Sequence, residues 1–195
     1  ENSYPNTFGG GVYIENGTCN LNHVTISGSK ADYGGGIYVE STCSISNSTI
    51  QENIGTTRGG GICVYYGTIP NLINSTISGN TCTDFGGGGI YIEDGTITNL
   101  ANCTVTANES TNDGSGGGIF IFQEMGTSSL NMKNSTGSGN TTSGSDKDIY
   151  VNWGTLTVAN SIISYYSNNS GTLNDNGYNV VEYQNESKFD SETSI

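Results

Sequence analysis

Gly34-Gly35-Gly36-Ile37-Tyr38-Val39 recurs with small changes along this chain of 195 residues. The other copies lie at 9–14, 59–64, 87–92 and 116–121, with a degenerate sixth copy at 146–151. Counted from the last residue of each triplet, successive copies are 25, 25, 28, 29 and 30 residues apart. Ile or Val at every second position is the period-two pattern of a β-strand. The chain is therefore predicted to contain short strands that recur every 25–30 residues.

A second landmark follows each triplet segment. Asn-Ser-Thr-Ile stands at 47–50 and 74–77, with variants at 102–105, 134–136 and 160–163, and His23 takes the Asn position in the first repeat. Further asparagines follow six residues later, at Asn53, Asn80, Asn108 and Asn140. Several of these residues lie in Asn-x-Ser/Thr, but an amide at the same turn of every coil can hydrogen-bond its neighbours. We expect asparagine ladders at these positions rather than glycans.

Repeats of this length bury their apolar side chains only by stacking on one another. The chain is therefore predicted to be all-β, a right-handed parallel β-helix of about six to seven coils. We expect one domain over residues 1–195, with an edge segment at 1–8, repeat coils at 9–176, and a terminal coil and tail at 177–195. Four inward columns begin at Val12, Ile14, Leu21 and Ile26, and Gly137 leaves a gap in the last of them.

Composition limits the partners of the chain. Five basic residues against 18 acidic ones give a formal net charge of −13, which would repel a phosphate backbone. We therefore expect no nucleic-acid partner. No apolar run has the length of a membrane span, so we also expect no membrane-spanning segment.

The two landmarks together resemble a known group. Gly-Gly-Gly-Ile followed by Asn-Ser-Thr-Ile-x-x-Asn is similar to the Gly-Gly-Ala-Ile and Phe-x-x-Asn repeats of polymorphic outer-membrane and other secreted β-helix adhesins. Gly replaces Ala here, and Ile50, Ile77 and Val105 stand where that family has Phe. The segment 175–182 resembles the terminal coil of secreted microbial β-helix proteins. The resemblance implies a β-helix in a secreted or cell-surface setting.

Covalent modification is predicted at two kinds of site. Asn16, Asn168 and Asn185 lie in Asn-x-Ser/Thr outside the asparagine columns, and they are the expected glycan acceptors. Cys19 and Cys43 align in adjacent coils, where Cα atoms about 4.8 Å apart lie within disulfide range. A secreted protein permits this bond. The cysteine spacing does not fit zinc.

Outward positions suggest contact surfaces. Between the first two inward columns lies an outward aromatic stripe, consisting of Tyr13, Tyr38, Tyr91, Phe120 and Tyr150. Such a stripe suits sugar stacking or a protein contact, and it equally suits plain strand propensity. Glu15, Glu40 and Glu93 follow the first strand of their repeats, where stacked carboxylates can hold Ca²⁺ or simply face solvent. Otherwise no cofactor is expected.

Three classes of function remain. We expect a non-catalytic structural or adhesive protein. Its copies would stack end to end, coil on coil, into a homopolymer that forms a surface fibre or layer. The alternative is an adhesin module that binds glycans through the aromatic stripe. A polysaccharide lyase or hydrolase is the third class, but the chain has few basic residues and no evident pair of catalytic carboxylates.

Overall fold

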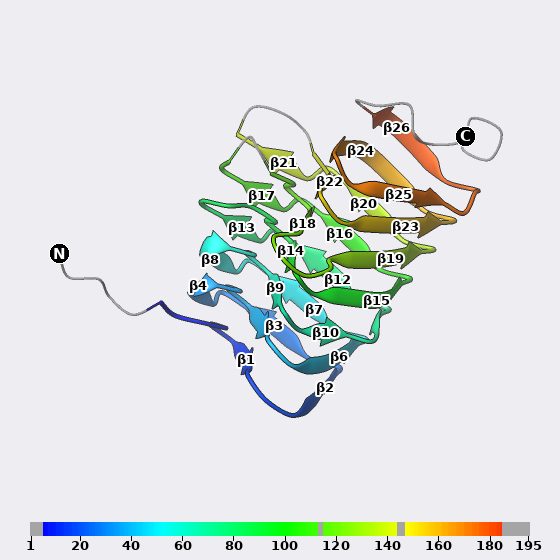
Figure 1. The fold of residues 1–195 in the computed structure, drawn as a ribbon. Helices are drawn as coiled ribbons and strands as arrows, with labels where there is room; N and C mark the ends of the chain where they lie inside the picture. Colours follow the sequence, from blue (N-terminus) through cyan, green and yellow to red (C-terminus); the bar gives the residue numbers. More distant parts are fainter. Residues whose placement is uncertain (1–5, 113–114, 144–146, 185–195) are drawn as a thin grey trace.

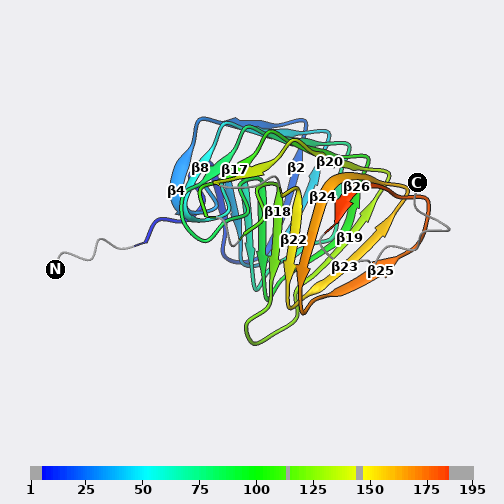
Figure 2. The same cartoon turned by 90° about the horizontal axis from the view of Figure 1, so that it is seen from above.

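A computed structural model of the chain describes residues 6–112, 115–143 and 147–184. The described residues form a parallel β-solenoid without a helix, as predicted. Successive coils rise from the blue end of the chain to the red end in Figure 1. Figure 2 shows their strands one behind another, with β4, β8 and β17 grouped at one side of the cross-section.

Strands from successive coils form three sheets. The 13-stranded sheet has two arms, of which the first carries the segments after the glycine triplets. The first arm consists of β1 (Val12–Ile14), β5 (Ile37–Val39), β9 (Ile62–Tyr65), β14 (Ile90–Glu93), β18 (Ile119–Phe122) and β22 (Ile149–Asn152). The second arm consists of β3 (Thr25–Ser27), β7 (Thr49–Gln51), β12 (Thr76–Ser78), β16 (Thr104–Thr106), β20 (Thr136–Ser138), β24 (Ile162–Asn169) and β26 (Val180–Gln184).

The other two sheets complete each coil. The 8-stranded sheet consists of β2 (Thr18–Asn22), β6 (Thr42–Ser46), β10 (Thr68–Ile69), β11 (Leu72–Ile73), β15 (Thr96–Ala101), β19 (Ser129–Lys133), β23 (Thr155–Ala159) and β25 (Thr172–Asp175). The 5-stranded sheet precedes the triplets and consists of β4 (Lys30–Tyr33), β8 (Ile54–Arg58), β13 (Thr81–Cys82), β17 (Glu109–Ser110) and β21 (Thr141–Thr142). Six coils contribute to the first arm, and a shortened seventh follows, in line with the predicted number.

The predicted inward columns form the solenoid core. Ile37 pairs with Ile62, and Ile62 with Ile90, in parallel register, and all three side chains are fully buried. The columns that begin at Ile14, Leu21 and Ile26 continue in the same way through the inner coils. Because the side chains of one column stack along the axis, a single apolar interior runs through all coils.

The glycine triplets allow the chain to turn and the coils to approach closely. Gly34 has a φ of +61°, which an L-residue adopts only with strain. A Cβ atom at Gly60 would lie 2.4 Å from the carbonyl oxygen of Gly88 in the next coil. No larger residue fits at Gly60 without displacing backbone.

Two asparagine ladders run along the solenoid, as predicted. The inner ladder consists of the fully buried Asn53, Asn80, Asn108 and Asn140, whose amides hydrogen-bond one another at 2.9 Å. Asp148 continues it, because its carboxylate accepts from the Asn140 side chain at 2.7 Å.

The outer ladder lies at an exposed turn. It includes Asn47, Asn74 and Asn102, which have φ near +50° and bond the preceding coil through their amides. His23 occupies the equivalent turn in the first coil, with φ +57°, as its alignment with these asparagines predicts.

Candidate functional site

A second apolar cluster lies outside the solenoid interior, on the outer side of the first arm. It consists of the buried residues Tyr38, Cys63, Tyr91 and Phe120, with Tyr33, Tyr65, Phe122 and Tyr150 packed against it. The prediction of an exposed aromatic stripe is therefore wrong at Tyr38, Tyr91 and Phe120. Tyr13 is exposed and Tyr150 is partly exposed, so only the ends of the stripe meet solvent.

Bulky residues just before the glycine triplets cover this cluster. Tyr33 ends β4, and its ring packs edge-on against Tyr38 at 6.4 Å. Arg58 ends β8, in register with Tyr33, and its guanidinium lies 5.0 Å from the ring centre of Phe85 and 5.7 Å from that of Tyr91. Because each triplet turns sharply, these side chains fold back over the first arm and bury its outer side.

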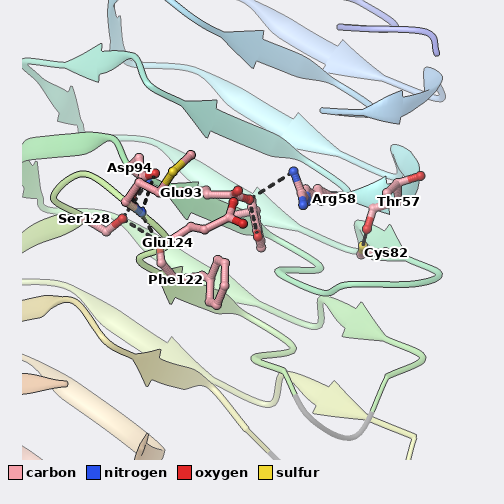
Figure 3. A network of polar contacts seen from close by, with 10 residues as sticks. Thr57, Arg58, Cys82, Glu93, Asp94, Phe122, Glu124 and Ser128 are labelled. Carbon is pink, nitrogen blue, oxygen red and sulfur yellow. Dashed lines mark hydrogen bonds and ion pairs between the residues drawn. The ribbon is translucent and has the colours of Figure 1, made fainter. Parts of the chain in front are cut away.

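A buried ion pair fixes Arg58 in this position (Figure 3). Arg58 Nη1 lies 3.1 Å from Glu93 Oε2, and the Tyr91 hydroxyl donates to the same oxygen at 2.6 Å. The Glu93 side chain is 0% exposed and that of Arg58 only 17%. Burial raises the pKa of Glu93 above its ordinary value, although the Tyr91 hydrogen bond and the Arg58 charge act in the opposite direction.

Next to the ion pair the surface is hollowed by a cavity of about 260 Å³. We call it the aromatic groove, and its lining residues are Asn6, Phe8, Tyr33, Tyr38, Glu40, Arg58 and Tyr65. Phe8 stacks on Tyr33 at 5.2 Å and lies tilted to Tyr38 at 5.0 Å, while Tyr38 and Tyr65 are 6.4 Å apart. Several ring faces and one exposed carboxylate, that of Glu40, therefore meet in one hollow.

This combination of groups defines what the groove can bind. Aromatic faces stack on apolar ligand surfaces, and a few convergent polar groups orient the ligand. Tyr13 donates to Glu40 Oε2 at 3.4 Å, which holds the carboxylate beside the rings. A second hollow of about 270 Å³ lies over β15, β19 and β23, but its described lining residues include no aromatic side chain. Of these two hollows, the aromatic groove is therefore the stronger candidate for a binding site.

The residues directly before the glycine runs indicate this groove in the sequence, whereas the aromatic stripe alone does not. Phe8, Tyr33, Arg58 and Phe85 are bulky residues that stand directly before glycine runs in successive coils. Bridges join Phe8 to Tyr33 and Tyr33 to Arg58. A column of large residues directly before the first four glycine runs predicts a covering layer, whereas Arg58 considered alone suggests an isolated surface charge.

The structure places the predicted disulfide and glycan sites as follows. Cys19 and Cys43 are paired in register, as predicted, but both are free thiols, as are Cys63, Cys82 and Cys103. Asn16 is exposed, as a glycan acceptor must be. Asn168 is buried and its amide bonds the backbone of Gly171, so its prediction as a glycan site is wrong. Asn185 lies outside the described residues.

The acidic column does not gather into a cation site. The Glu93 carboxylate is already bonded to Arg58 and Tyr91. In the register of the coils, Tyr65 separates Glu93 from Glu40. Within 6–112, 115–143 and 147–184, no three His, Cys, Asp or Glu side chains come together in a way that could hold a metal ion. Over the same residues, no helix has the length and apolar character of a transmembrane span.

Comparisons with protein-family models, with curated proteins and with solved structures give no match for this chain. The likeness to adhesin repeats therefore depends on the repeat pattern alone.

Proposed function

We propose that this chain is a non-catalytic, extracellular adhesive protein that binds carbohydrate through the aromatic groove. The groove is the observation that carries this proposal. Phe8, Tyr33 and Tyr65 provide ring faces above the buried Tyr38, and Glu40 provides an acceptor for sugar hydroxyls in the same hollow. The likeness to secreted adhesin repeats supports the extracellular setting.

The chemistry of the groove favours binding over hydrolysis. A glycosidase needs two carboxyl groups on either side of the bond that it cleaves. Glu40 is the sole carboxylate among the described residues that line the groove. Glu93 lies behind the wall of the groove, fully buried and bonded to Arg58 and Tyr91, so it supports the wall rather than facing a ligand.

Replacing Tyr65 with leucine should weaken glycan binding by about tenfold, because one stacking face is lost while an apolar side chain remains. Glu40→Gln should weaken it less, since an amide still accepts hydrogen bonds. A glycan array identifies the ligand, and calorimetry with the best-binding oligosaccharide measures both changes. Tyr178→Asn is the matched control, since Tyr178 is exposed on the terminal coil with φ +58°. Equal affinity for wild type and Tyr65→Leu, or no glycan binding at all, would contradict the proposal.

The first coil favours a second function, self-association by coil-on-coil stacking. The inward side chains Val12 and Leu21 are only half-buried, whereas their counterparts Ile37 and Ile45 in the next coil are fully buried. Val24 of the first coil is also half-buried. A further coil would cover these side chains and pair the strand edges, whether it comes from a longer polypeptide or from a second copy.

Leu21→Lys places a charge on the open surface of the first coil and should prevent such stacking. Sedimentation velocity over a concentration series measures the result. We expect wild type to form larger species as concentration rises and Leu21→Lys to remain monomeric at every concentration. Monomeric wild type at high concentration would exclude self-association, without affecting the carbohydrate proposal.

A further inference from the structure

Exposed aromatic side chains also stand at the corner that follows the first arm. Tyr66 follows β9 and Trp153 follows β22, and their side chains are 48% and 56% exposed. Both have left-handed backbones, with φ of +56° and +57°, where bulky residues are rare and strained. Asn or Gly would relieve that strain at a solvent-exposed turn. Stability alone would therefore favour Asn or Gly over the tyrosine and the tryptophan at these two positions.

The loop that follows β18, which lies between β9 and β22 in the first arm, is held onto the same corner. Figure 3 shows Asp94 beside Glu124 of this loop. Asp94 occupies the turn equivalent to Tyr66, because Glu93 pairs with Tyr65 in the register. Its carboxylate accepts from the backbone N–H groups of Glu124, Met125 and Gly126 at 2.9 to 3.3 Å. Met125, at the tip of the loop, is 80% exposed. We call Tyr66, Met125 and Trp153 the corner ridge.

The corner ridge continues the aromatic groove. Tyr65 lines the groove, and its ring meets that of Tyr66 edge-on at 4.6 Å. From β9 to β22 the ridge crosses three coil steps of about 4.8 Å each. A ligand that fills the groove and extends along the solenoid axis would therefore reach the ring of Trp153.

The ridge offers separate stacking faces rather than a continuous apolar patch. Polar residues such as Asp94 and Glu124 stand between its members, whereas a protein interface needs a larger apolar core. Together with Glu40 in the groove, these carboxylates would repel a polyanion. Such a surface suits a chain of uncharged sugar rings.

Resting on the proposed carbohydrate function, we propose that the aromatic groove and the corner ridge form one track for an extended, uncharged polysaccharide that lies along the solenoid axis. The groove takes one end of the bound stretch, and Tyr66 and Trp153 stack on sugar rings farther along it. Both rings are exposed at their left-handed turns, where they can make this contact.

Calorimetry with cello- and chito-oligosaccharides of two to six units tests the track, with oligogalacturonates as the acidic comparison. Wild type should bind six units about tenfold more tightly than two, and the uncharged series more tightly than the acidic one. Trp153→Asn should abolish the gain with length and leave the affinity for two units unchanged. Its melting temperature should not fall, since Asn suits the left-handed turn. Tyr178→Asn, which also replaces an aromatic residue with Asn at an exposed left-handed turn but on the terminal coil, should preserve the gain.

Different results would refute the proposed track and the proposed carbohydrate binding in the groove. Binding that does not strengthen with length, or a length gain that persists in Trp153→Asn, would refute the track while leaving carbohydrate binding in the groove intact. Tighter binding of the acidic series would refute the proposed uncharged ligand. Absence of binding to every oligosaccharide would refute both proposals together.

Discussion

Replacing Asn80 with alanine should lower the free energy of unfolding by about 4 kcal/mol. The Asn80 side chain accepts from the backbone and side-chain nitrogens of Asn53, at 3.0 and 2.9 Å. It donates to the Ile50 carbonyl and to the Asn108 side chain, at 3.0 and 2.9 Å. All of these groups are buried, so alanine leaves several donors and acceptors without partners, at about 1–3 kcal/mol each.

Urea denaturation of the purified chain measures this loss. Asn99→Ala is the matched control, because the Asn99 amide also bonds an asparagine of the preceding coil but lies on the exposed side of β15. We expect that variant to lose less than about 1 kcal/mol. A loss of the same size in both variants would mean that the inner ladder contributes no more than a surface hydrogen bond.

Much of the solenoid could be predicted because its determinants repeat. An Ile or Val column needs only period-two alternation and a constant register, and both are visible at Ile37, Ile62 and Ile90. The inner ladder followed from the same logic, since one amide per coil at a fixed offset can pair only with its copies. The register also placed Cys19 beside Cys43, although both thiols are free.

Features that depend on a second layer could not be predicted in the same way. Alternation shows that Tyr38 and Tyr91 face away from the core, but not that Tyr33 packs on Tyr38 and Arg58 on Tyr91. Phe120 also faces away from the core, and it is buried by its aromatic neighbours Tyr91, Phe122 and Tyr150. The prediction for Asn168 is wrong because the last coil is short. There β24 pairs with both β20 and β22, which draws Asn168 into register with Val151 and buries it.

Arg58→Met should cost about 3–5 kcal/mol at neutral pH, because it leaves the Glu93 carboxylate buried without its counter-ion. The loss should depend on pH. The pKa of Glu93 is raised in the folded protein, and removal of the neighbouring guanidinium should raise it further. A carboxyl with a raised folded pKa favours the folded state below its unfolded pKa, and this advantage is lost as pH rises through the folded value. Arg58→Met should therefore approach wild-type stability near pH 4 and fall increasingly below it toward pH 8.

The double variant Arg58→Met/Glu93→Gln separates this effect from the titration of other carboxylates. The introduced amide would keep a hydrogen-bonding partner for Tyr91 but carry no charge, so the double variant should recover most of the lost stability at neutral pH. Urea midpoints of wild type, the single variant and the double variant from pH 4 to pH 8 provide the comparison. If Arg58→Met loses equal stability at both ends of that range, Arg58 acts by packing against Tyr33, Phe85 and Tyr91 rather than by charge. In that case the wall of the aromatic groove depends on the bulk of the arginine side chain, and Glu93 is not its anchor.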